Sequence, residues 1–194
     1  QGFGNEHLAV GWQLPGGALE RPIPPTRLSP YGGLTSRKTP RPSFHLAPPE
    51  GPVARSALVG GPGGADFEDA PGPRMFLRGL KYALTGSGNL SALQPLYLGT
   101  SGESEGGRSG GGNPGQEIAA RPGYAVGGMI ARGTDRLNAF KLVFMRISGS
   151  RLLATDRYES DWIGHRGGGT EVTLGGDGTP VLGLCGKAGS EVDA

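Results

Sequence analysis

Three clusters of glycine punctuate the second part of this sequence and constrain its fold more than any other feature. They are Gly60-Gly61-Pro62-Gly63-Gly64, Gly110-Gly111-Gly112 and Gly167-Gly168-Gly169. The chain has 39 glycines in 194 residues, far above the average of about 7%, and it lacks the G-X-Y period of collagen. Few stretches escape Gly or Pro for long enough to form a helix. Short strands joined by turns are therefore the consistent interpretation.

Around these clusters, a strand, a turn and a second strand recur three times. The copies cover 80–84, 85–91 and 92–98; 128–131, 132–138 and 139–145; and 181–185, 186–193 and Ala194. Ala92, Ala139 and Ala194 correspond in this alignment, at intervals of 47 and 55 residues. A repeat of about fifty residues indicates one supersecondary unit that cannot bury its apolar face alone. We therefore expect an all-β prism of three pseudo-symmetric sheets.

Alternating apolar residues provide the core of this prism, because every second side chain of a strand points to the same face. The inward positions are predicted at Leu80, Tyr82 and Leu84, and at Phe140, Leu142 and Phe144. Pro95 lies in the middle of a predicted strand. Because proline lacks a backbone N–H, we expect that strand to lie at a sheet edge or to carry a bulge.

Residues 1–52 differ in composition from residues 53–194, which we assign to the prism. Eight of the 17 prolines fall between positions 22 and 49, and proline disfavours both helix and sheet interior. We expect an extended N-terminal arm that orders only against another surface, with one strand-like segment at 7–14.

Residues 59–69 and residues 186–194 each combine glycines with acidic residues, and both segments resemble parts of the jacalin-related lectins. Residues 59–69, Val-Gly-Gly-Pro-Gly-Gly-Ala-Asp-Phe-Glu-Asp, are similar to the opening strand of that family and its Gly-Gly-x-Gly-Gly turn. Residues 186–194, Gly-Lys-Ala-Gly-Ser-Glu-Val-Asp-Ala, are similar to its closing Gly-x-x-x-Asp loop. The resemblance covers about 57–194. It implies a β-prism of three Greek-key sheets that binds a hexose of the mannose or glucose type between the two loops.

This resemblance implies a set of site residues: Gly64, Gly189, Ser190, Glu191 and Asp193. Asp193 would accept hydrogen bonds from two adjacent hydroxyls, and the N–H groups of Gly64, Ser190 and Glu191 would donate to sugar oxygens. Gly64 and Gly189 would let the backbone approach the ligand closely. The alternative for each is structural: the glycines shape turns, and Asp193 is a solvated carboxylate.

Pseudo-symmetry predicts a second, weaker site at the turn 133–138. It would use Asp135, Arg136 and Asn138, with Gly168 in the facing loop. Asp135 and Asn138 have the spacing of Ser190 and Asp193, but an amide oxygen accepts fewer hydrogen bonds than a carboxylate. The first turn ends in Ser91, and we expect no good site there. Asn89-Leu90-Ser91 is also an N-glycosylation sequon.

Other classes of function find little support. The net charge is +2 with scattered basic residues, and no apolar run approaches a membrane span. His7, His45 and His165 lack metal-ligand spacing, so no metal or cofactor is expected. Glu159 and Asp161 are interpreted as the solvent face of a strand rather than a catalytic pair, and the lone Cys185 as a small buried hydrophobe. We therefore expect no enzyme.

A first residue Gln1 instead of Met favours a secreted protein whose leader was removed.

A rival hypothesis is a structural, self-assembling extracellular protein. The family places a strand directly after its Asp, whereas this sequence ends at Ala194. Either the encoded chain continues, or a segment such as 8–14 fills the gap by strand addition from the same or a neighbouring molecule. The partners to be distinguished are thus a glycan or glycoprotein and a second copy of this chain.

Overall fold

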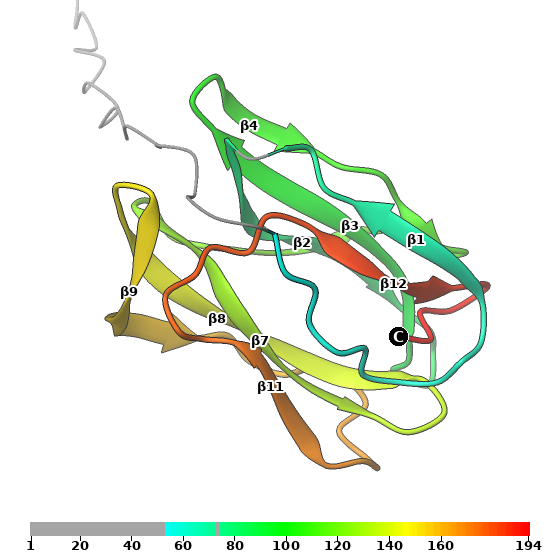
Figure 1. Ribbon diagram of the computed structural model, residues 1–194. Coiled ribbons are helices and arrows are strands. Elements are labelled where there is room, and N and C mark those ends of the chain that lie inside the picture. The colour runs from blue at the N-terminus through cyan, green and yellow to red at the C-terminus, as the bar shows by residue number, and fades with distance from the viewer. Residues whose placement is uncertain (1–52, 73) are drawn as a thin grey trace, which may run out of the picture. The chain divides into compact units, whose positions relative to one another are not determined.

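The computed structural model describes residues 53–72 and 74–194, and every regular element in these ranges is a β-strand (Figure 1). The strands are β1 (Ala65–Asp69), β2 (Met75–Leu84), β3 (Leu90–Gly99), β4 (Gly102–Glu105), β5 (Ser109–Gly110), β6 (Gln116–Ala119), β7 (Tyr124–Gly133), β8 (Leu137–Ser148), β9 (Arg151–Glu159), β10 (Ile163–Gly164), β11 (Glu171–Gly175) and β12 (Leu184–Ala188). Within the described part of the chain, no helix could cross a membrane. The arm expected over residues 1–52 lies outside the described residues.

The strands form three antiparallel sheets, two of which are built alike. One has the order β4-β3-β2-β6 with β5 also pairing with β3, and the other has the order β10-β8-β7-β11 with β9 also pairing with β8. In the third sheet β1 pairs with β12, so that the cyan and red ends of the described chain meet in Figure 1. β1 adds to β12 as β6 adds to β2 and β11 adds to β7. The expected all-β prism with three pseudo-symmetric sheets is confirmed.

The repeats also share their irregularities. In the hairpins β2–β3 and β7–β8 the register shifts twice, between Leu77 and Gly79 and between Val126 and Gly128, and again beside the turn. The shift beside the turn leaves one extra residue in the second strand, Ser91 and Asn138 respectively. In the third repeat Ala188 bridges Val192, and the Lys187 N–H donates to the Ala194 carbonyl at 2.8 Å, so Asp193 is the extra residue. Bulges thus place Ser91, Asn138 and Asp193 at equivalent positions.

The three sheets share one apolar core. The predicted residues Leu80, Phe140, Leu142 and Phe144 are all buried in it, and Tyr82 and Leu84 pack against it while half-buried. Each hairpin turn adds one apolar side chain, namely Leu90, Leu137 and Val192. A second cluster, which includes Phe76, Val143 and Met145, lies on the opposite face, because Val143 and Met145 alternate with the core residues of β8.

Pro95 lies inside a sheet, so the edge position expected for its strand is wrong. β3 is flanked by β2 on one side and by β4 and β5 on the other. The interruption that proline requires is in the partner: β4 ends at Glu105 and β5 begins at Ser109. Between them the Gly106 N–H donates to the Pro95 carbonyl at 2.9 Å. The bulge therefore belongs to the strand that faces the missing N–H.

The third repeat begins later than the sequence predicts. The strand expected at 181–185 runs from Leu184 to Ala188, and the turn shrinks to the few residues after it. The reason is Gly186, which the sequence suggests to be a turn residue. It lies buried within β12, where a Cβ atom would collide with the Ala194 carbonyl. This glycine allows two backbone segments to approach closely rather than starting a turn.

Candidate functional site

The loop 60–64 and the loop 189–193 lie against one another, as predicted. The Gly61 N–H donates to the Asp193 carbonyl oxygen at 2.8 Å. A Cβ atom on Gly63 would lie 3.1 Å from the Asp193 Cγ, and one on Gly64 would lie 2.6 Å from its Oδ2. Gly189 approaches from the other loop, 3.9 Å from the same oxygen by the same measure. Three glycines therefore surround the Asp193 carboxylate without side chains of their own.

Local backbone geometry explains why glycine is needed here. Gly64 has a φ of +72°, in the left-handed region that other residues rarely adopt. A side chain there would also meet the Ala188 backbone at 2.5 Å. Asp193 occupies the bulge position, so its backbone joins the sheet at Lys187, whose carbonyl accepts from the Asp193 N–H at 2.8 Å. The bulge aims the carboxylate at the glycine loop while the sheet holds its main chain.

Several backbone and side-chain groups of these two loops have no hydrogen-bond partner among the described residues. Among residues 53–72 and 74–194, no donor is within hydrogen-bond range of the Asp193 carboxylate, and no acceptor takes the N–H of Gly64, Ser190 or Glu191. Gly64, Gly189 and Ser190 are exposed and Asp193 is half-buried. The arrangement thus offers a fixed acceptor and three backbone donors, a set suited to vicinal hydroxyls.

Glu191 contributes its backbone to this loop but not a free side chain. Its Oε2 accepts a hydrogen bond from Arg136 and lies 3.4 Å from the Asn89 Nδ2. The Ser190 carbonyl faces the glycine cluster 110–112, where the Gly111 N–H donates to it at 3.4 Å. Of the predicted residues, Gly64, Gly189 and Asp193 lie together, while the Glu191 side chain turns away from them.

At the second predicted site the backbone is arranged as at the first, but the side chain at the bulge, Asn138, is hydrogen-bonded. The Asn138 Nδ2 donates to the Gly167 carbonyl at 2.7 Å, and Gly168 lies beside it. The Asn138 Nδ2 therefore joins its own two loops, while its buried Oδ1 has no hydrogen-bond partner among the described residues. Asp135 is exposed and accepts from the Thr134 hydroxyl at 2.9 Å, an interaction that lowers the pKa of Asp135. Gly168 and Asn138 thus lie together, and Asp135 is linked to Asn138 through the Thr134 hydroxyl, which accepts from the Asn138 Nδ2 at 3.4 Å. Arg136 does not join them, because its side chain pairs with Glu191.

Sequence reasoning missed Gly61 and Gly63, which contact Asp193 more directly than Gly189 does. Their presence in the Gly-Gly-x-Gly-Gly turn was the signal available.

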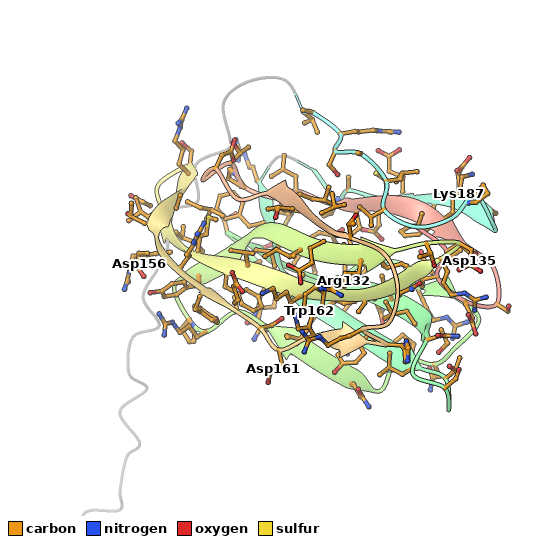
Figure 2. All side chains as sticks on the ribbon, turned by 90° about the horizontal axis from the view of Figure 1, so that it is seen from below. Arg132, Asp135, Asp156, Asp161, Trp162 and Lys187 are labelled. Atoms are coloured by element: carbon orange, nitrogen blue, oxygen red, sulfur yellow. The ribbon has the colours of Figure 1, made fainter. Side chains whose placement is uncertain are left out.

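The sequon asparagine, Asn89, is half-buried, and its two following residues, Leu90 and Ser91, are 0% and 9% exposed. Glycosylation at Asn89 stays a prediction. Figure 2 shows Asp135 and Lys187 at the end where these loops meet and Asp156 at the other end.

The fold is the β-prism of the jacalin-related lectins. Calystegia sepium agglutinin matches with a TM-score of 0.53 and 17% identity, over 72% of this chain and 90% of that chain. A mannose binding jacalin related lectin from Ananas comosus matches with a TM-score of 0.50 and 19% identity, over 71% of this chain and 90% of that chain. Artocarpin complexed with Me-alpha-mannose matches with a TM-score of 0.52 and 14% identity, over 72% and 91%. No family model and no curated protein matches the sequence.

Proposed function

We propose that residues 53–194 bind a hexose of the mannose or glucose type between the loops 60–64 and 189–193, and that the protein is a lectin-like module rather than an enzyme. The observation that carries this proposal is the Asp193 carboxylate, which is surrounded by glycines and has no partner among the described residues. The fold neighbours support it, since one is described as mannose binding and another was solved with Me-alpha-mannose.

The chemistry is recognition without bond breakage. Two adjacent hydroxyls of a pyranose donate to the two oxygens of Asp193, and the N–H groups of Gly64, Ser190 and Glu191 donate to ring and hydroxyl oxygens. The absence of side chains on Gly63, Gly64 and Gly189 gives the ring room to reach these groups. A charged acceptor makes each hydroxyl contact stronger than a neutral one would be.

Calorimetric titration of the full chain with methyl α-D-mannoside and methyl α-D-glucoside tests this proposal. We expect saturable binding that Asp193→Asn weakens about tenfold or more, because charge-assisted hydrogen bonds contribute about 1.5–3 kcal/mol. The matched control is Asp161→Asn, which removes an exposed carboxylate outside the site. Equal affinity in the Asp193→Asn variant, or no hexose binding by the wild type, contradicts the proposal.

A second candidate function is self-association, and the β1–β12 sheet supports it. Among the described residues, Val192, Asp193 and Ala194 cover the second edge of β12 at Lys187 and Ala188, and no strand pairs with that edge at Leu184 and Cys185, which leaves it open to another strand. Beside them is a groove of about 440 Å³ lined by Arg55, Ser56, Leu58, Asp66, Phe67, Glu68, Cys185 and Gly186. Leu58 is 51% exposed there. A second copy of the chain would supply the strand.

Light scattering on the full chain tests self-association. We expect a mass above that of the monomer, which Leu58→Lys lowers by placing a charge in the groove. The control is Leu153→Lys, because Leu153 is a similarly exposed leucine on β9, 40% exposed and outside this groove. A monomeric wild type, or an equal fall in mass for both variants, rules out this groove as an interface.

A further inference from the structure

Three residues from the three repeats meet where the hairpin turns converge. Asn89, Arg136 and Glu191 each precede the apolar residue that its turn contributes to the core, namely Leu90, Leu137 and Val192. Those apolar residues are 0%, 5% and 1% exposed. The Val192 N–H donates to the Leu90 carbonyl at 2.9 Å, which joins the first and third turns directly. The equivalent polar residues therefore lie around the pseudo-threefold axis, over one buried apolar layer.

Glu191 is the acceptor at the centre of this polar cluster. Its Oε2 forms an ion pair with the Arg136 guanidinium and lies 3.4 Å from the Asn89 Nδ2. The Arg136 and Glu191 side chains are 38% and 24% exposed. Partial removal from water strengthens their attraction compared with a fully exposed pair. A second carboxylate, that of Asp135, lies 3.7 Å from the Arg136 Nη2 but is 78% exposed.

We propose that Arg136 is a positioning residue for the hexose site, although it belongs to a different repeat. The deduction rests on the proposed function. Glu191 lies between Ser190 and Asp193, so anchoring its side chain at the axis leaves its N–H on the loop that faces the glycine turn. Without Arg136, this carboxylate loses its one cationic partner in the described part of the chain. The loop 189–193 then samples conformations in which the N–H groups and Asp193 no longer converge, and ordering it costs affinity.

The same ion pair links the two predicted sites. In the turn that contains Arg136, the Thr134 N–H donates to the Arg136 carbonyl at 3.1 Å. The equivalent bond in the third repeat joins the Gly189 N–H to the Glu191 carbonyl at 2.9 Å. A change that displaces the turn 133–137 therefore displaces the anchor of the loop 189–193. The hexose site depends on a loop that never touches the sugar.

Amide hydrogen exchange on the full chain tests the anchor independently of any sugar. In Arg136→Ala we expect faster exchange at Gly189, Val192 and Asp193, whose N–H groups are hydrogen-bonded in the wild type. Arg157→Ala is the matched control, because Arg157 is an exposed arginine on β9, away from these turns. Unchanged exchange at all three amides overturns the proposal, whether or not the protein binds hexose.

Affinity measurements then test the consequence for binding. Arg136→Ala should weaken methyl α-D-mannoside binding about three- to tenfold with little change in enthalpy of unfolding. Arg136→Glu should weaken it further by repelling Glu191, and the exchanged pair Arg136→Glu with Glu191→Arg should recover most of the loss. A merely structural defect at position 136 would not be rescued by a second substitution. If the exchanged pair does not recover affinity while Arg136→Glu is still folded, the proposal for Arg136 is wrong. If the wild type itself binds no hexose, only the proposed lectin function is wrong.

Discussion

Gly64 is required by the fold and is also part of the proposed hexose site. Its φ of +72° is one that residues with a side chain rarely adopt. A Cβ atom at this position would also lie 2.5 Å from the Ala188 carbonyl carbon, which is a steric clash. We expect Gly64→Ala to lower the melting temperature, with a loss of about 1 kcal/mol or more in unfolding free energy, and to abolish hexose binding.

Gly86→Ala is the matched control for this substitution. A Cβ atom at Gly86 meets nothing within 4 Å, and its φ is not in the left-handed region. Thermal unfolding should therefore show no loss of stability, because alanine restricts the unfolded chain more than glycine does. Equal destabilisation by the two substitutions would mean that the backbone at Gly64 is not as constrained as the structure indicates.

The residue scale is also where prediction from sequence was most uneven. Asp193 was named because residues 186–194 resemble the family's Gly-x-x-x-Asp loop, and in the sequence repeat it precedes Ala194 as Ser91 precedes Ala92 and Asn138 precedes Ala139. Gly186 could not, because a glycine looks the same in sequence whether it forms a turn or lets two backbones approach. The Arg136–Glu191 pair was also missed, since its members are 55 residues apart and meet only when the prism closes.

At the scale of elements, the strand pair β8–β9 carries a pH-dependent interaction. The Arg146 guanidinium and the Tyr124 hydroxyl both bind the Asp156 carboxylate, and their hydrogen bonds lower the pKa of Asp156 below its usual value. A lowered carboxyl pKa in the folded state adds stability above the unfolded value, near pH 4, and that stability is lost as the pH falls.

We therefore expect wild type and Asp156→Asn to differ in melting temperature at pH 7 and to converge below about pH 4. The difference at pH 7 should be small, because both charged side chains are substantially exposed. Melting curves between pH 2.5 and 7 measure it, with Asp161→Asn as the control. A gap that widens toward low pH would contradict the sign of this contribution.

The long hairpins β2–β3 and β7–β8 were predicted correctly, while the strands around them were not resolved individually. The hairpins contain ten or more residues per strand with a clear apolar alternation. β5 and β10 have two residues each, too few for a period to show. Pro95 was expected to place its own strand at an edge or to give it a bulge, whereas the bulge is in the partner, because a single strand's sequence does not state its pairing.

For the whole molecule, the three repeats predict a binding stoichiometry. Only the third repeat combines a carboxylate at the bulge with a free glycine turn, because Asn138 is bonded to Gly167 and Ser91 is buried. We expect one hexose per chain in calorimetry, bound more weakly by Asp193→Asn and with unchanged affinity by Asn138→Ala. A second equivalent of bound sugar that disappears in Asn138→Ala would show that the second site is functional.

The residue at the bulge beside each hairpin turn can change without changing the pairing of the strands. The residue at this position is surplus to the pairing register, so the sheets do not specify what its side chain must be. Serine, asparagine and aspartate occupy it in one and the same chain. A single base change in the Asn138 codon yields aspartate, so one mutation gives two repeats of this chain the same bulge residue.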